Sequence, residues 1–150
     1  MPGADKDEKT THKKKKHDKE LSGINAGITK SILTNEDFDN GANLFLMMFN
    51  PTCSHCQEET VMLGQNLDLF KKSKVVLAAS AIQQPYVSDF VKYTHFENYP
   101  FYLGIDSSDF INKLFLYKAL PQINIYDKNR ILIKTYSGEV PIDSLKPYIQ

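Results

Sequence analysis

The residues best suited to chemistry in this chain are Cys53 and Cys56, which enclose Ser54 and His55. They are the only two cysteines among 150 residues, so neither a disulfide framework nor a four-cysteine zinc site can be assembled. Two intervening residues on a first helical turn bring the sulfurs close enough to form a disulfide. The pair therefore indicates reversible thiol–disulfide exchange.

The position of the pair along the chain predicts different roles for the two thiols. An apolar run, Leu44 to Phe49, is typical of a buried central strand, and a turn through Pro51 leads from it into a helix that starts near Ser54. A cysteine at a helix N-terminus meets unpaired N–H groups and the positive end of the helix dipole, both of which favour the thiolate. We therefore predict Cys53 as the nucleophile and Cys56 as the resolving thiol.

A single CxxC motif is also compatible with half of a zinc site or with two unreactive thiols. Zinc would require a second CxxC or an HxxxH pair, and the chain contains neither. We predict no metal ion and no other cofactor.

Strand and helix patterns alternate after residue 20, which is typical of an α/β domain around a mixed sheet. A hairpin is expected over residues 123–135, with its loop at 127–130. The other predicted strands are Ile28–Leu33, Leu44–Phe49, Val75–Ala79 and Phe101–Ile105, and the predicted helices are Ser54 to about Lys72, Val87–Thr94, Phe110–Lys118 and Ile142–Ile149.

Composition excludes several classes of function. The chain has 18 Lys and Arg against 18 Asp and Glu, so it has no surplus charge to attract nucleic acid. Its longest apolar run, Leu44 to Phe49, is far shorter than the roughly 18 residues of a membrane span. Residues 1–20 are dominated by charge and predict a disordered tail or tether, whereas residues 21–150 form one domain.

Residues 22–150 resemble the TlpA/ResA-like thiol-disulfide oxidoreductases. The resemblance rests on Asn50-Pro-Thr-Cys53-Ser-His-Cys56 between strand and helix, on Leu120-Pro121 before the hairpin, and on Gly138 before the last helix. It implies a thioredoxin-like three-layer fold, with a central mixed sheet flanked by helices. It also implies that Pro121 is cis and faces the cysteine pair, and that substrate contacts Thr52, Leu120 and Pro121. An ordinary trans proline at a strand edge is the alternative for Pro121.

Other positions refine the resemblance. Many family members carry Trp where this chain has Thr52, and thioredoxins carry a buried Asp where it has Met47. Glu59, three residues after the second cysteine, matches the exported branch of the family. His55 is similar to the histidine of DsbA-like sites, which implies that it tunes the redox pair by stabilising the first thiolate. Exposure of His55 to solvent, with little effect on the thiols, is the alternative.

Helical geometry gives Glu59 a role of its own. It shares one helix face with apolar residues at spacings of three and four, so it is expected to point inward. A desolvated carboxylate there would accept the proton of Cys56 during resolution. Glu58 should face water. The alternative is a solvent-exposed Glu59 that only complements the helix dipole.

Together these residues predict an enzyme, a thiol-disulfide oxidoreductase that acts on proteins with thiols or disulfides and is recycled by a membrane or soluble redox partner. The resemblance favours an exported, periplasmic location over the cytoplasm. Two alternatives share the fold: a peroxiredoxin-like peroxidase, although position 50 is Asn and not the Thr of PxxxTxxC, and a non-catalytic peptide-binding module.

Overall fold

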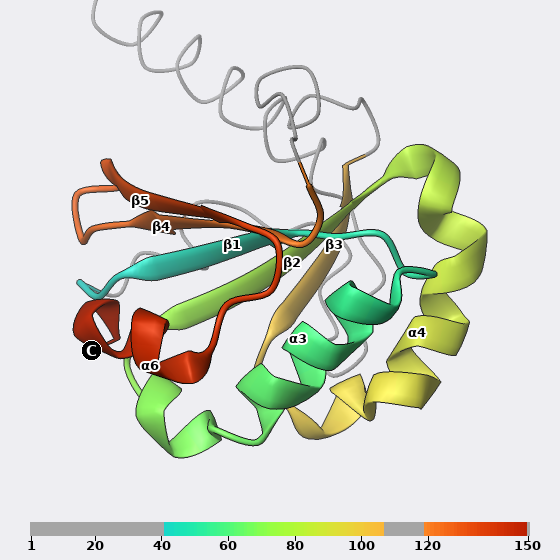
Figure 1. Ribbon diagram of the computed structural model, residues 1–150, viewed down its shortest axis with the longest axis horizontal. Coiled ribbons are helices and arrows are strands. Elements are labelled where there is room, and N and C mark those ends of the chain that lie inside the picture. Colours follow the sequence, from blue (N-terminus) through green and yellow to red (C-terminus); the bar gives the residue numbers. More distant parts are fainter. Residues whose placement is uncertain (1–40, 107–118, 150) are drawn as a thin grey trace, which may run out of the picture.

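A five-stranded mixed sheet with the strand order β3-β2-β1-β4-β5 organises the protein (Figure 1). The computed structural model describes residues 41–106 and 119–149. Strand β1 (Leu44–Met48) lies at the centre and pairs in parallel with β2 (Lys74–Ser80), which pairs in parallel with β3 (Tyr102–Asp106). On its other side β1 pairs antiparallel with β4 (Gln122–Tyr126), and β4 continues through a hairpin into β5 (Leu132–Ser137).

Helices α3 (Ser54–Gly64), α4 (Val87–Thr94) and α6 (Ile142–Leu145) lie on the same face of this sheet (Figure 1). The main hydrophobic core fills the space between them, because alternate residues of the buried strands point toward the helices. Aromatic rings link the layers: the centroids of Phe45 and Phe70 are 5.4 Å apart, and those of Phe49 and Phe90 are 4.5 Å apart.

Most predicted elements that fall within the described residues are confirmed. The apolar run from Leu44 is the central strand, the three strands expected near residues 75, 101 and 123 are present, and a helix covers 87–94. Short 3-10 helices that the sequence pattern did not predict flank α4: η2 (Ala81–Tyr86) and η3 (Phe96–Asn98).

The helix predicted from Ser54 to about Lys72 was too long. It ends at Gly64, and a separate 3-10 helix, η1 (Leu67–Phe70), carries the later apolar residues. A side chain at Gly64 would overlap the Tyr99 ring, so the close approach of that ring requires glycine there. The Asn66 side chain then donates a 2.8 Å hydrogen bond to the Met62 carbonyl, satisfying one of the acceptors left free at the helix end.

The prediction of one helix over Ile142–Ile149 was also wrong in part. The α-helix stops at Leu145 and continues as the 3-10 helix η4 (Lys146–Tyr148). Pro147 has no N–H group to donate to the carbonyl four residues earlier, which ends the α-helical ladder.

Three predictions fall outside the described residues: the tail at 1–20, the strand at Ile28–Leu33 and the helix at Phe110–Lys118. In the described part of the chain, no helix combines the length and apolar character that a membrane span requires.

Candidate active site

The turn between β1 and α3 places the cysteine pair at the end of the central strand. The Asn50 side-chain oxygen accepts hydrogen bonds from the Thr52 N–H at 3.0 Å and from the Thr52 hydroxyl at 2.9 Å. The Asn50 carbonyl accepts one from the Cys53 N–H at 3.1 Å. This Asx turn defines the backbone conformation that leads into the first turn of α3.

Cys53 is the N-cap residue of α3, with extended backbone at φ −82° and ψ 121°. It is partly exposed, and no side-chain hydrogen bond caps the helix. The thiol therefore lies next to the N–H groups of the first helical turn, which have no partner within the helix. A partly exposed cysteine at this place can be reached by another protein.

Cys56 is completely buried, with an exposed fraction of 0%. Burial raises the pKa of its thiol to about 12, and the neighbouring Cys53 thiol and Glu59 carboxylate also raise it. Both cysteines are free thiols. Cys56 is therefore protonated and shielded from solvent, and it needs a proton acceptor before it can act as a nucleophile.

Glu59 lies one helical turn beyond Cys56 and is only 3% exposed, which confirms that it points inward. One carboxylate oxygen accepts a 3.2 Å hydrogen bond from the Val140 N–H, and the other is buried without a hydrogen-bond partner. Burial raises the pKa of Glu59 to about 7, with a further upward contribution from Glu139, while the Val140 hydrogen bond lowers it. Glu58, the preceding residue, is exposed as expected.

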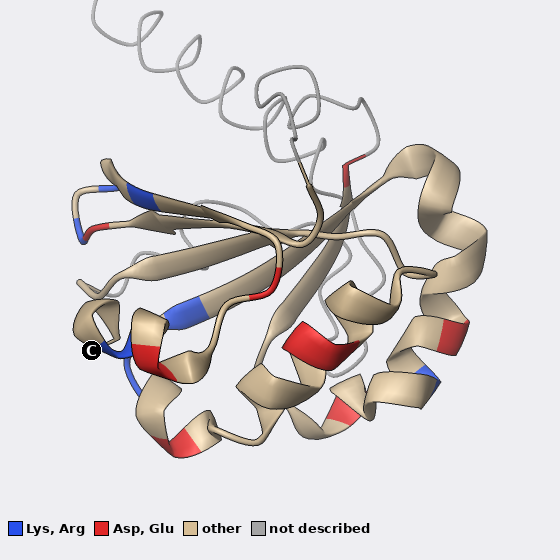
Figure 2. Cartoon of the chain, viewed as in Figure 1, with Lys and Arg blue, Asp and Glu red and all other residues tan. Residues whose placement is uncertain are grey.

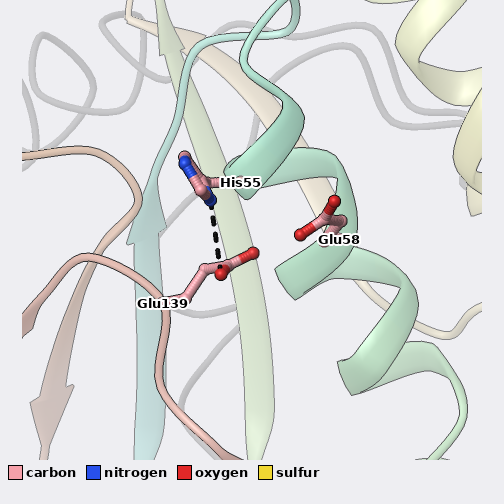
Figure 3. Close-up of side chains that lie close together, drawn as sticks. All are labelled: His55, Glu58 and Glu139. Atoms are coloured by element: carbon pink, nitrogen blue, oxygen red, sulfur yellow. Dashed lines mark ion pairs between the residues drawn. The ribbon is translucent and has the colours of Figure 1, made fainter.

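His55 is on the outer side of the same helical turn (Figure 3). Its Nδ1 lies 3.3 Å from a carboxylate oxygen of Glu139, with side-chain exposures of 65% and 38%. The pKa of Glu58 is raised, chiefly by a hydrogen bond with Glu139 and by the charge of that residue. The imidazole thus contacts a carboxylate from another element while most of its surface stays exposed to solvent.

These three side chains also form the one group in the described part of the chain with ligand atoms close enough to hold a metal ion, all within 4.8 Å of one another. All three are exposed, and exposed acidic groups are common without an ion. Neither cysteine belongs to the group.

The predicted substrate-contact residues lie at the same end of the sheet. The register of β4 against β1 pairs Gln122 with Met48, which places Pro121 beside the end of β1. The Leu120–Pro121 peptide bond is cis, and the Pro121 carbonyl accepts a 2.8 Å hydrogen bond from the Gly138 N–H. Thr52 is exposed.

Leu120 also lines a hollow of about 180 Å³ at the end of β1 and β2. The other lining residues are Met48, Phe49, Asn50, Ala78, Ser80 and Gln83. Its lining is about equally polar and apolar, with Asn50, Ser80 and Gln83 supplying the polar groups.

Sequence reasoning missed Glu139 and Val140. Both lie in the segment that joins β5 to α6, and Val140 meets Glu59 across 81 positions of the chain. Gly138, the residue before them, was identified as part of the family resemblance, but no local pattern relates Glu139 and Val140 to α3.

Comparisons with known proteins identify the fold. No family model matches the sequence, and no curated protein matches it closely. Among solved structures, MTB DsbF superimposes with a TM-score of 0.66 at 20% identity, covering 86% of this chain and 92% of that one. A secreted disulfide oxidoreductase of Mycobacterium tuberculosis, described as homologous to E. coli DsbE, gives 0.62 at 17% identity, covering 87% and 96%.

The thioredoxin domain of a thiol-disulfide oxidoreductase from Bacteroides vulgatus gives a TM-score of 0.63 at 15% identity, covering 85% of this chain and 91% of that one. The protein therefore has the thioredoxin-like fold, and this prediction is confirmed.

Proposed function

We propose that the protein is a thiol-disulfide oxidoreductase similar to the TlpA/ResA-like enzymes, acting on other proteins through Cys53 and Cys56. The observation that carries the proposal is the asymmetry of the pair. Cys53 is partly exposed at the start of α3, whereas Cys56 is fully buried one turn later and is followed by a buried carboxylate. The solved structures described above as disulfide oxidoreductases share the same fold, which supports the proposal.

Reduction of a substrate disulfide starts at Cys53. Its thiolate attacks one substrate sulfur, the substrate S–S bond breaks, and the other substrate sulfur leaves as a thiolate. The product is a mixed disulfide between Cys53 and the substrate. Partial exposure of Cys53 allows this encounter, while buried Cys56 is protected from it.

Resolution requires Cys56 to lose its proton. Glu59, with a pKa raised to about 7, takes that proton near neutral pH when it is ionised. The Cys56 thiolate then attacks the Cys53 sulfur, the second substrate thiolate leaves, and a Cys53–Cys56 disulfide forms. The substrate gains two electrons and the enzyme loses two, so a redox partner must return the enzyme to the dithiol. Oxidation of a substrate dithiol is the same sequence in reverse.

The remaining assignments follow from this cycle. Thr52, Leu120 and Pro121 border the substrate surface, His55 tunes the Cys53 thiolate, and the partners are proteins that carry thiols or disulfides. We also propose that the protein acts outside the cytoplasm, on the periplasmic side; the secreted M. tuberculosis oxidoreductase with the same fold supports this location.

Reduction of insulin by dithiothreitol tests the proposal. The wild type should accelerate insulin precipitation, and Cys53→Ser should abolish the acceleration. Cys56→Ser should accumulate a mixed disulfide through Cys53 that a non-reducing gel resolves. No redox cycling by the wild type would favour the non-catalytic peptide-binding alternative, and rapid stoichiometric oxidation by micromolar hydrogen peroxide would favour the peroxidase.

A further inference from the structure

The segment Gly138–Val140, which joins β5 to α6, binds two separate parts of the candidate active site through its backbone. The Gly138 N–H donates a 2.8 Å hydrogen bond to the Pro121 carbonyl, and the Val140 N–H donates a 3.2 Å hydrogen bond to the Glu59 carboxylate. Gly138 has a φ of +84°, in the region that favours glycine, so the chain can turn sharply between these two contacts. The segment therefore links the start of β4 to the interior side of α3.

Glu139 is the residue between these two contacts, and its side chain extends outward to α3. Figure 3 shows it facing both His55 and Glu58, and its carboxylate oxygen lies 3.3 Å from the His55 Nδ1. The same residue thus meets the exposed side of α3 while its neighbour Val140 meets the buried side. The contact with His55 and the donor to Glu59 therefore belong to consecutive residues of one segment.

The charge of Glu139 reaches Glu59 as well. Among the described residues, Glu59 interacts electrostatically with two titratable groups, Cys56 on α3 and Glu139 on the joining segment. Glu58 and His55 face Glu139. Figure 2 shows acidic residues on α3 and on the segment before α6, with no Lys or Arg on α3. The negative charge at Glu139 therefore favours the protonated form of Glu59.

We propose that Glu139 is a positioning residue for the proton transfer from Cys56, an inference that rests on the proposed function. Its contact with His55 fixes the segment that presents the Val140 donor to Glu59. Its charge adds to the effect of burial in favouring the protonated form of Glu59. The outer and inner sides of the redox helix are in this way connected through one residue of a different element.

Titration of the Glu59 carboxyl by carbon-13 NMR in the reduced full-length protein tests this inference, with Glu59→Gln identifying the resonance. The wild type should titrate with a midpoint near the value of about 7 given above. Glu139→Gln keeps the size of the side chain and removes its charge, so the midpoint should move to lower pH by about half a pH unit. The acid side of the pH profile for mixed-disulfide resolution should move in the same direction.

Two further variants keep the test specific. Glu139→Asp retains the charge, so the Glu59 midpoint in this variant should lie close to the wild-type value. Glu58→Gln removes another exposed carboxylate, from α3 itself, and should leave the midpoint unchanged. The inference is overturned if Glu139→Gln does not move the midpoint, or if Glu58→Gln moves it as far. A wild type that titrates as expected but exchanges no disulfides would instead refute the proposed function alone.

Discussion

The two sides of the redox helix α3 differ strongly in solvent exposure, although their residues are neighbours in the sequence. Cys53 at the N-cap is partly exposed and His55 and Glu58 on the outer side are exposed, whereas Cys56 and Glu59 on the inner side are almost completely buried. The accessible and the buried set each hold a thiol and a carboxylate. Burial on the inner side raises the pKa of Cys56 to about 12 and that of Glu59 to about 7. Position on the helical turn, rather than residue type, thus separates a group that meets substrate from groups that exchange a proton.

The largest expected effect comes from removing the inner carboxylate. Glu59→Gln should slow resolution of the mixed disulfide by about tenfold or more, because Cys56 then loses its proton acceptor. Stopped-flow kinetics from pH 5 to 9 should also show that the rise in rate with pH near 7 disappears.

The matched control on the outer side is Glu58→Gln, which should resolve the mixed disulfide at the wild-type rate throughout. Equal rates for wild type and both variants would show that Glu59 is not the acceptor.

Glu59 should also make the stability of the protein depend on pH. The pKa of Glu59 rises from 4.5 to about 7 on folding, so the native state binds a proton that the unfolded chain has released. This contribution is complete below pH 4.5 and is lost as pH rises toward about 7, by about 2 to 3 kcal/mol in the free energy of unfolding. Urea denaturation at pH 5 and pH 8 should show the loss in the wild type.

Glu59→Gln should lack most of that loss, since the amide does not titrate. If the free energy of unfolding of Glu59→Gln falls between pH 5 and 8 as much as that of the wild type, another group causes the pH dependence.

A smaller effect is expected at the joining segment. Gly138→Ala places an L side chain at a φ of +84° without a clash, because nothing lies within 4 Å of the added Cβ. The backbone strain should lower the free energy of unfolding by about 1 kcal/mol. Thermal or urea denaturation measures it.

Gly41→Ala is the matched control, with a φ of +72° and equally open surroundings. Both variants should lose similar stability, but only Gly138→Ala should also alter the pH profile of resolution. Identical exchange kinetics in the two variants would argue against a link between the joining segment and Glu59.

The parts of the molecule that local patterns determine were predictable. The apolar run of β1 is the central strand, although Leu44 and Leu46 on one face are only half-buried. Helical spacing placed Glu59 inward and Glu58 outward, as the structure shows. The parts that depend on distant contacts were not. Helix α3 ends where Gly64 meets Tyr99, and Glu59 meets Val140, pairs that no sequence period connects.

Thiol reactivity tests the central contrast between the two sides most directly. The reduced protein would be treated with iodoacetamide near neutral pH for increasing times, and the labelled peptides mapped. The structure predicts that Cys53 is alkylated first, because it is partly exposed at the helix N-terminus, while Cys56 is buried with a pKa of about 12. Labelling of Cys56 at the same rate as Cys53, or faster, would contradict the assignment of nucleophile and resolving thiol.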